Sequence, residues 1–370
     1  MKSALNSCLL GYFFIGLLIL MSPVGLPVPE DRIRPALLPT MKRMVVVILL
    51  TTVHVSSAEN LTLSENLTGD TFWEAFVFFT DADPTHGFVD FVGKDEAMSS
   101  GLAGVNNQGQ IFMNADSTNV SASTGRRSVR IASSKAYNKG LFVADLEHMP
   151  TGCGTWPAFW MVGDKWPSGG ELDIIEGVDE QDAVVTTLHT SDGCDQSGED
   201  PELFTGTWQY GIDREASNCF INAEGQWSNQ GCGIGGAVGT MGSQFNDAGG
   251  GIFAALWDPT GDQSISTWFF PAGAEPNDLK ANAPEPSTWG LPYARFALTD
   301  DACPPSHFSN MKLVFDLTFC GDWDGATYPQ NCADEIQANQ WPTTCEDFVA
   351  NYPEEFEGAR WLVNSIRVFE

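Results

Sequence analysis

Basic residues are scarce in this chain, and no long apolar run occurs after residue 58. Its 18 Lys and Arg compare with 48 Asp and Glu, which gives a formal net charge of −30 at pH 7. A surface of this sign repels nucleic acids, anionic membranes and anionic polysaccharides. We therefore expect a neutral polysaccharide-type partner and no nucleic acid. A membrane span needs about 20 apolar residues, and no segment after residue 58 offers one.

Metal-binding cysteine motifs are also missing. The sequence has no Cys-x-x-Cys pair and no Cys/His cluster with ligand spacing, so we expect no metal site. No other motif implies a redox or nucleotide cofactor, and we expect none. Of the nine cysteines, Cys8 lies near the N-terminus and the other eight follow residue 150. An even set is compatible with disulfides in an oxidising compartment, with the connectivity open. Cys219 and Cys232 flank a Gly/Asn-rich segment and are candidates for a local pair.

The first 58 residues have the pattern of an export segment. Apolar residues run from 8 to 25 and again from 44 to 50, and the second run follows Lys42 and Arg43. Positive residues, a short apolar core and small residues up to Ala58 are typical of a secretory signal peptide. We expect cleavage after Ala58 and a secreted protein. In the alternative interpretation, residues 8–25 anchor the protein in a membrane.

Residues 59–370 have the pattern of one all-β domain. Long amphipathic helical patterns are scarce, no internal repeat is visible, and short apolar runs alternate with Gly, Pro and Asn turns. Many short strands in a domain of this size predict a two-sheet β-jelly-roll sandwich. The proline-rich residues 275–310 are predicted as a long ordered loop, and short helices are predicted around 332–338 and 344–352. The glycosylation acceptors of a secreted chain are Asn60, Asn66 and Asn119.

The run Glu171-Leu172-Asp173-Ile174-Ile175-Glu176 places three carboxylates in an apolar, β-branched segment bounded by glycines. In a regular strand Glu171 and Asp173 face one side and Glu176 the other. A one-residue bulge between Asp173 and Glu176 would bring all three to one face. The Cα atoms of Glu171 and Glu176 would then lie about 13 Å apart at ~3.3 Å per residue. Inward-leaning side chains would leave about 5 Å between the carboxyl groups, the separation found in retaining glycosidases.

Spacing alone does not establish an active site, because so acidic a chain is expected to contain this pattern by chance. The alternative is a solvated edge strand with scattered acids. Leu172, Ile174 and Ile175 indicate a packed strand instead, where unpaired carboxylates are costly. In a glycosidase one Glu attacks the sugar and the other donates a proton, and the spacing leaves their order open. The negative charge of Asp173 should make the three groups titrate as a coupled set.

Aromatic residues precede the acidic run and are candidates for sugar binding. Trp156 and Trp160 are four residues apart, so both can face the same side of a strand, and Trp166 follows. Flat indole rings can stack on the C–H faces of sugars, whereas the alternative for each tryptophan is the core. His189 lies on the next predicted strand, where an antiparallel neighbour could place its ring near Glu176 or a bound sugar.

Several motifs together resemble glycoside hydrolase family sixteen, in its fungal-type laminarinase (endo-1,3(4)-β-glucanase) branch. The main ones are the segments 152–161, 170–177 and 187–191. Further matching segments lie at 83–87, 127–131, 269–271, 319–323 and 361–365. The resemblance implies a concanavalin-like β-jelly roll with an open substrate cleft and a retaining mechanism. It implies Glu171 as nucleophile, Glu176 as acid/base and Asp173 as the assisting carboxylate. The implied sugar contacts are Trp160, Trp166, His189 and, on the far cleft wall, Trp257.

Two segments depart from that branch. Residues 178–186 lack its usual Asn and Asn-Gln residues, and residues 254–256 lack a Glu before Trp257. We expect catalysis to be retained and polar sugar contacts to be missing there. The predicted function is a secreted, monomeric endo-β-glucanase that hydrolyses internal β-1,3 bonds, with neighbouring β-1,4 bonds as a second linkage. The alternatives are a cell-wall glucan transglycosylase and a non-catalytic, lectin-like glucan-binding jelly roll.

Overall fold

The computed structural model describes residues 61–121 and 123–370. The predicted signal sequence, the alternative anchor at 8–25, Cys8 and Asn60 lie outside the described residues. Within the two described ranges, no helix is long and apolar enough to cross a membrane.

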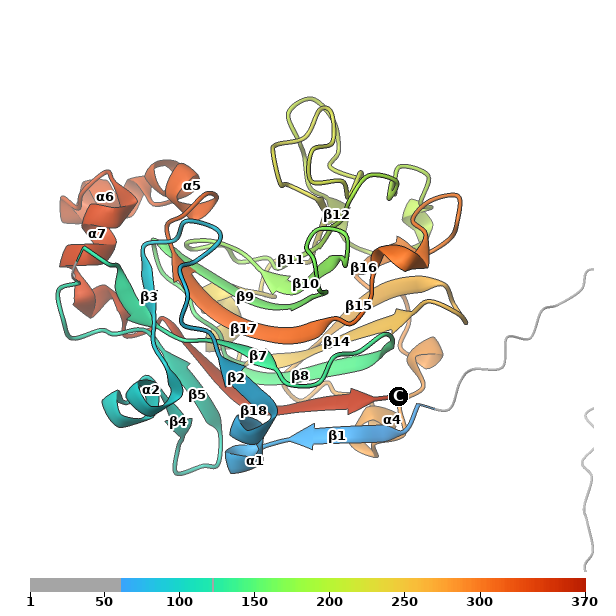
Figure 1. The fold of residues 1–370 in the computed structure, drawn as a ribbon, viewed down its shortest axis with the longest axis horizontal. Helices are drawn as coiled ribbons and strands as arrows, with labels where there is room; N and C mark the ends of the chain where they lie inside the picture. The colour runs from blue at the N-terminus through green and yellow to red at the C-terminus, as the bar shows by residue number, and fades with distance from the viewer. Residues whose placement is uncertain (1–60, 122) are drawn as a thin grey trace, which may run out of the picture. The chain divides into compact units, whose positions relative to one another are not determined.

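Two large antiparallel sheets form the body of the described domain (Figure 1). Sheet A runs in the order β16 (Ala294–Ala297), β15 (Ser264–Pro271), β14 (Gly251–Asp258), β8 (Gly140–His148), β18 (Arg360–Phe369), β5 (Ile111–Asn114) and β4 (Ala103–Val105), with β1 (Leu63–Leu67) also paired to β18. Sheet B runs in the order β12 (Thr207–Trp208), β13 (Cys232–Gly235), β11 (Val185–His189), β10 (Glu171–Glu176), β9 (Thr155–Val162), β17 (Lys312–Phe319), β7 (Arg130–Ser133) and β2 (Phe76–Phe78). A small parallel pair joins β3 (Val89–Phe91) to β6 (Arg126–Ser128). The predicted two-sheet jelly roll is confirmed.

Side chains alternate between the two faces of each strand, and the burial of each face shows where a polar site can lie. Phe142 and Phe253 of sheet A and Phe159 and Phe315 of sheet B belong to one fully buried cluster between the sheets. The opposite face of sheet A is partly apolar too, because its alternate residues form a second cluster with Leu279 of the helix α4 (Asn277–Lys280). Part of the outer face of sheet A is therefore covered by apolar packing, although Asp145 and Asn364 form a hydrogen bond on that face. The outer face of sheet B carries a row of acidic side chains instead, on β10 and β17.

The remaining helices are short and lie outside the two sheets. They are α1 (Gly69–Ala75), α2 (Lys94–Ser100), α3 (Gly242–Asp247), α5 (Asp324–Asn331), α6 (Ala333–Asn339) and α7 (Cys345–Asn351), with 3-10 turns at Pro201–Leu203, Pro286–Thr288, Pro305–His307 and Pro353–Phe356. Helices α5, α6 and α7 gather at one end of sheet B, and the loop between β12 and β13 rises at the other end (Figure 1). We call this loop, residues 209–231, the β12–β13 lobe. The predicted helices around 332–338 and 344–352 correspond to α6 and α7.

Four disulfides join the eight described cysteines. They are Cys153–Cys332, Cys194–Cys303, Cys219–Cys232 and Cys320–Cys345. The predicted local pair is confirmed, and it closes the β12–β13 lobe. The bonds from Cys332 and Cys345 attach the α5–α7 helices to sheet B.

The prediction of one long loop over 275–310 is wrong in part. This segment contains the helix α4 and the strand β16, which extends sheet A beyond β15. Its prolines lie outside β16, and β16 is an edge strand, where a ladder tolerates interruption. A four-residue strand between prolines leaves little periodicity for a sequence pattern to show.

Candidate active site

The acidic run forms β10, an interior strand of sheet B. Its carboxylates stand opposite alternate residues of β9, which point to one face of the sheet. The opposing pairs are Glu171–Val162, Asp173–Trp160 and Glu176–Ala158. The register shifts between Asp173 and Ile175, where one extra residue is inserted. The predicted bulge is thus confirmed, and it brings all three carboxylates to the outer face of sheet B.

Two polar side chains hold this bulge from the core side. The Thr186 hydroxyl donates to the Ile174 carbonyl at 3.0 Å. The Tyr293 hydroxyl lies 3.3 Å from the same carbonyl and 2.6 Å from the Thr186 oxygen. A bulge frees a backbone carbonyl from the ladder, and a buried one must find another donor. Sequence analysis missed both residues: the Thr186 contact depends on the register of β11 against β10, and Tyr293 is 119 residues from Ile174 in the chain.

The three carboxylates are shielded from water and hold their protons tightly. The Glu171 side chain is 16% exposed and that of Asp173 only 3%. Burial, and then the charge of Asp173, raises the pKa of Glu171 and that of Glu176 to about 8 each. Burial and the charge of Asp316 raise the pKa of Asp173 as well. At neutral pH this group of acids can therefore both donate and accept a proton, as acid–base chemistry requires.

His189 lies beside the carboxylates. Its Nε2 atom is 3.3 Å from Asp173 Oδ2 and 3.9 Å from Glu171 Oε1. A Cβ at Gly231 would stand 2.9 Å from His189 Nδ1, so only glycine leaves room for the ring there. The ligand atoms of Glu171, Asp173 and His189 lie within 4.8 Å of one another, a spacing that could hold a cation. The antiparallel pairing does bring His189 to the acidic strand, but its partner there is Glu171 and not Glu176, the predicted neighbour.

Trp156 contacts the acidic strand directly. Its Nε1 donates to Glu176 Oε1 at 2.9 Å, and this bond lowers the pKa of Glu176 against the effect of burial. Its ring meets the ring of Trp323 edge to face, with centroids 5.7 Å apart. Trp323 lies just before α5 and was not singled out as a site residue. Its segment belongs to the resemblance, but only the fold shows that it reaches β9.

Trp160 and Trp166 differ in their surroundings. Trp160 is half-buried on the outer face of sheet B, and its Nε1 donates to Asp316 Oδ1 at 3.3 Å. Trp166 lies in the loop between β9 and β10 and is 44% exposed, so its ring is accessible to a ligand. The expectation that Trp156 and Trp160 share one face is confirmed, since they oppose Thr318 and Val314 of β17.

The prediction that Trp257 lines the cleft is wrong. Trp257 belongs to β14 of sheet A, is 1% exposed and lies in the core between the sheets. The nearby departure at residues 254–256 lies on the same strand, so it does not remove a sugar contact. Alternation places Trp257 correctly within its strand, but it cannot tell which of the two sheets the strand joins.

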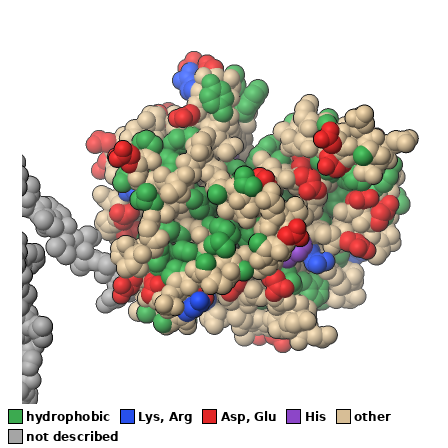
Figure 2. All heavy atoms as spheres, turned by 180° about the vertical axis from the view of Figure 1, so that it is seen from behind, with side chains coloured by type: hydrophobic (Ala, Val, Ile, Leu, Met, Phe, Trp, Pro, Cys, Tyr) green, Lys and Arg blue, Asp and Glu red, His purple; other side chains and the backbone are tan. Residues whose placement is uncertain are grey.

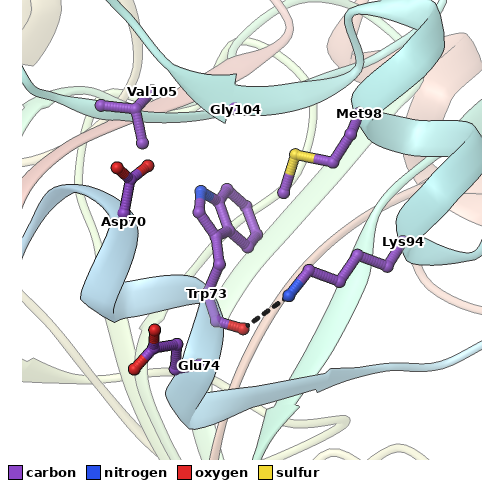
Figure 3. A pocket seen from close by; sticks show the side chains of 7 residues that line it. All are labelled: Asp70, Trp73, Glu74, Lys94, Met98, Gly104 and Val105. Carbon is purple, nitrogen blue, oxygen red and sulfur yellow. Dashed lines mark hydrogen bonds between the residues drawn. The ribbon is translucent and has the colours of Figure 1, made fainter.

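The molecular surface is indented beside the β12–β13 lobe (Figure 2). Seen from behind, the molecular surface dips between the β12–β13 lobe and the end that carries α5–α7 (Figure 2). On the lobe, Tyr210 and Trp227 are 66% and 61% exposed. A separate pocket between α1, α2 and β4 contains none of the predicted site residues, and its Lys94 ammonium already donates to the Trp73 carbonyl at 3.0 Å (Figure 3).

A jelly roll with proton-holding carboxylates, a histidine and tryptophans on one exposed sheet face defines a carbohydrate-cleaving enzyme of the retaining glycosidase class. The family model described as an XgeA-like, catalytic GH16 domain matches residues 76–369. The chain therefore belongs to glycoside hydrolase family sixteen, in its XgeA-like group.

Three relatives illustrate the similarity. The endo-1,3(4)-beta-glucanase of Arthroderma benhamiae is 40% identical over 314 residues, which cover 83% of this chain and 64% of that protein. The chain thus spans less than two thirds of that relative's length. An elongating GH family 16 beta-1,3-glucosyltransferase of known structure is 38% identical, with a TM-score of 0.73 over 84% of this chain and 100% of that one. Laminarinase 16A from Phanerochaete chrysosporium, solved with 6-O-glucosyl-laminaritriose in donor and acceptor sites, is 36% identical with the same TM-score and coverage.

Proposed function

We propose that this protein is an endo-β-glucanase that cleaves internal β-1,3 bonds of a neutral glucan with retention of configuration. The observation that carries the proposal is the bulge in β10, which turns Glu171, Asp173 and Glu176 to one face. The names of the relatives support β-1,3-glucan as the substrate class. The acidic surface agrees with a neutral polymer, since it would repel an anionic one.

In the proposed first step, Glu176 donates its proton to the glycosidic oxygen and the Glu171 carboxylate attacks the anomeric carbon. The bond to the leaving sugar breaks, and a covalent glycosyl-enzyme forms at Glu171. In the second step, the Glu176 carboxylate takes a proton from water, whose oxygen attacks the same carbon and releases Glu171. Trp156 orients Glu176 through its 2.9 Å hydrogen bond. The order of the two roles rests on the family resemblance, because both pKa values are raised alike.

Asp173 has the role of an electrostatic partner. It lies between the two glutamates on β10, and its charge raises the pKa of both. When the first glutamate ionises, the added negative charge disfavours ionisation of the second. This coupling separates the two ionisations, so between them the pair has one ionised and one protonated member. His189 adds positive character that lowers the pKa of both glutamates.

A glucan transglycosylase is the second candidate, and it follows from the similarity to the elongating glucosyltransferase. The chemistry differs only in the second step, where a sugar hydroxyl replaces water. Side-by-side digestion of laminarin, mixed-linkage β-glucan, xyloglucan and agarose tests both. We expect reducing ends from laminarin and products shorter than the substrate. Products longer than the donor would favour transfer, and glucan binding without reducing ends would favour a lectin.

The matched variants Glu171→Gln and Glu224→Gln test the mechanism in the same assay. We expect Glu171→Gln to lower kcat by at least about 10³-fold, as loss of a covalent nucleophile does. Glu224 is exposed on the β12–β13 lobe, so its variant should keep wild-type activity. Undiminished activity of Glu171→Gln would refute this assignment of the nucleophile.

We further propose that the protein is exported and acts as a monomer outside the cell. The pairing of all eight described cysteines supports an oxidising compartment. Sequencing of the secreted product should give a new N-terminus at Glu59. Activity that stays with the membrane fraction would support the anchored alternative instead.

A further inference from the structure

A fourth buried acid lies beside the site and has no part in the proposed mechanism. Asp316 of β17 is 6% exposed. It stands opposite Ala158 of β9, which in turn stands opposite Glu176 of β10. Residues opposite one another in antiparallel strands share a face, so Asp316 and Glu176 belong to one row across sheet B. Only the small Ala158 separates them in that row.

Asp316 also binds a tryptophan of the candidate site. Its Oδ1 accepts from Trp160 Nε1 at 3.3 Å, and its Oδ2 lies 3.8 Å from Arg130 Nη1. The Arg130 guanidinium lies over the Trp160 ring, 5.0 Å from its centroid, and over Phe79 at 4.5 Å. The indole of Trp160 is thus held at its nitrogen by an acid and on its face by a cation.

Charged residues from several strands surround Asp316. Arg130 of β7 lies 3.8 Å from both Asp316 and Asp83, and Asp83 precedes β3. Asp173 and Glu176 of β10 are the acids on the other side, and His189 of β11 lies beyond them. Burial raises the pKa of Asp316 to about 7, and Arg130 lowers it. The charge of Asp316 in turn raises the pKa of Asp173 and of Glu176.

We propose that Asp316 and Arg130 are positioning residues of this active site. They fix the indole plane of Trp160 for sugar binding, and Asp316 places a negative charge beside the carboxylates of β10. The inference rests on the proposed function, because it gives Trp160 a sugar to bind and Glu176 a proton to donate.

Two substitutions at one position separate the two effects. Asp316→Asn keeps an oxygen for the Trp160 N–H and removes the charge. We expect the KM of this variant for laminarin to stay within about threefold of the wild-type value. The alkaline limb of its kcat/KM profile should move to lower pH, because Glu176 then loses its proton more easily. Asp316→Leu removes both the charge and the acceptor. We expect the same shift of the limb and about a tenfold rise in KM, since a freed indole loses orientation.

A purely structural role for Asp316 predicts a different result. Both variants would then lower thermal stability and leave the pH profile and KM of the folded enzyme unchanged, and that outcome would overturn the proposal. Calorimetric binding of a laminari-oligosaccharide to a Glu171→Gln background provides a readout without turnover. About tenfold weaker binding by the Asp316→Leu double variant supports the positioning role even if the glucanase assignment fails, and equal binding contradicts it.

Discussion

The glutamates of β10, Glu171 and Glu176, keep their protons at a pH at which exposed acids are ionised. For Glu171 the ordinary pKa of 4.5 rises to about 8 on folding. The folded state therefore binds this proton more tightly than the unfolded state, and stability falls as pH rises from the first value towards the second.

Replacing the Glu171 carboxyl by a neutral amide should remove this loss of stability at high pH. We expect Glu171→Gln to exceed the wild type in free energy of unfolding by about 1–3 kcal/mol at pH 8 and to match it at pH 4. Denaturant titration at both pH values measures the difference. The exposed control Glu224→Gln should show no such pH dependence. If Glu171→Gln proved less stable than the wild type at pH 8, that result would contradict the assigned burial.

Trp156 controls the proton of Glu176 through one hydrogen bond. Trp156→Phe keeps an aromatic ring but removes the N–H that favours the ionised form, so the pKa of Glu176 should rise. We expect the alkaline limb of kcat/KM to move up by about half to one pH unit. This direction is opposite to that expected for Asp316→Asn. A limb that stays in place would show that Trp156 does not act on the acid.

For single residues, sequence analysis identifies site residues that stand within one motif. It misses residues that reach the site only through the pairing of strands. Glu171, Asp173 and Glu176 stand together in the chain, so their pattern could be interpreted. Asp316 is also an acid within an apolar run, Lys312–Phe319, and that signal could have found it. Arg130 lies on another strand, β7, and only the cross-strand pairing brings it to Trp160.

Among the elements, the bulged strand β10 depends on a hydroxyl from its neighbour β11. Thr186→Val keeps the shape of the side chain and removes the donor to the Ile174 carbonyl. We expect a loss of about 0.5–1.5 kcal/mol in stability, the usual net contribution of one hydrogen bond, because the Tyr293 hydroxyl still lies 3.3 Å from the carbonyl. We also expect at least a tenfold fall in kcat, because Glu176 loses its fixed position.

Thr186→Ser is the matched control, since it keeps the hydroxyl. It should retain most of the activity that Thr186→Val loses. Equal activity of the two variants would mean that the backbone holds the bulge without this hydrogen bond. Melting curves and initial rates on laminarin measure both effects.

The elements show a similar limit of sequence analysis. The β10 bulge could be predicted because a glycosidase site requires its carboxylates on one face, and only a bulge brings all three there. The edge strand β16 could not be predicted, because four residues between prolines show no clear alternation. The misplacement of Trp257 has a different origin, because its cleft position was taken from the family resemblance. A strand's periodicity gives its two faces but not the sheet to which it belongs.

For the whole molecule, the acidic surface should select among glucans by charge. Acidic side chains are spread over the face drawn in Figure 2, and basic ones are few. We expect KM for a carboxymethylated β-1,3-glucan to be several times higher than that for laminarin at about 0.01 M salt, and to fall as salt rises to about 0.3 M, since salt screens the repulsion. KM for neutral laminarin should change little. Equal salt dependence for both polymers would contradict the prediction.

The fold class could be predicted at this scale because the evidence is statistical. Many short strands, frequent turn signals and few helical patterns all favour one large β-sandwich, and errors in single elements do not change that result. The order of strands within each sheet could not be derived in this way, because it depends on crossovers between distant segments.

Strand β18 has a consequence for how the protein is made. It lies within sheet A, with β8 on one side and β5 and β1 on the other. A ribosome synthesises every strand of sheet B before residues 360–369 exist. Until then β8 and β5 present open edges, which can pair with other nascent chains. A stop codon shortly before residue 360 would therefore yield an aggregating fragment, not a smaller enzyme, even though every catalytic carboxylate had already been translated.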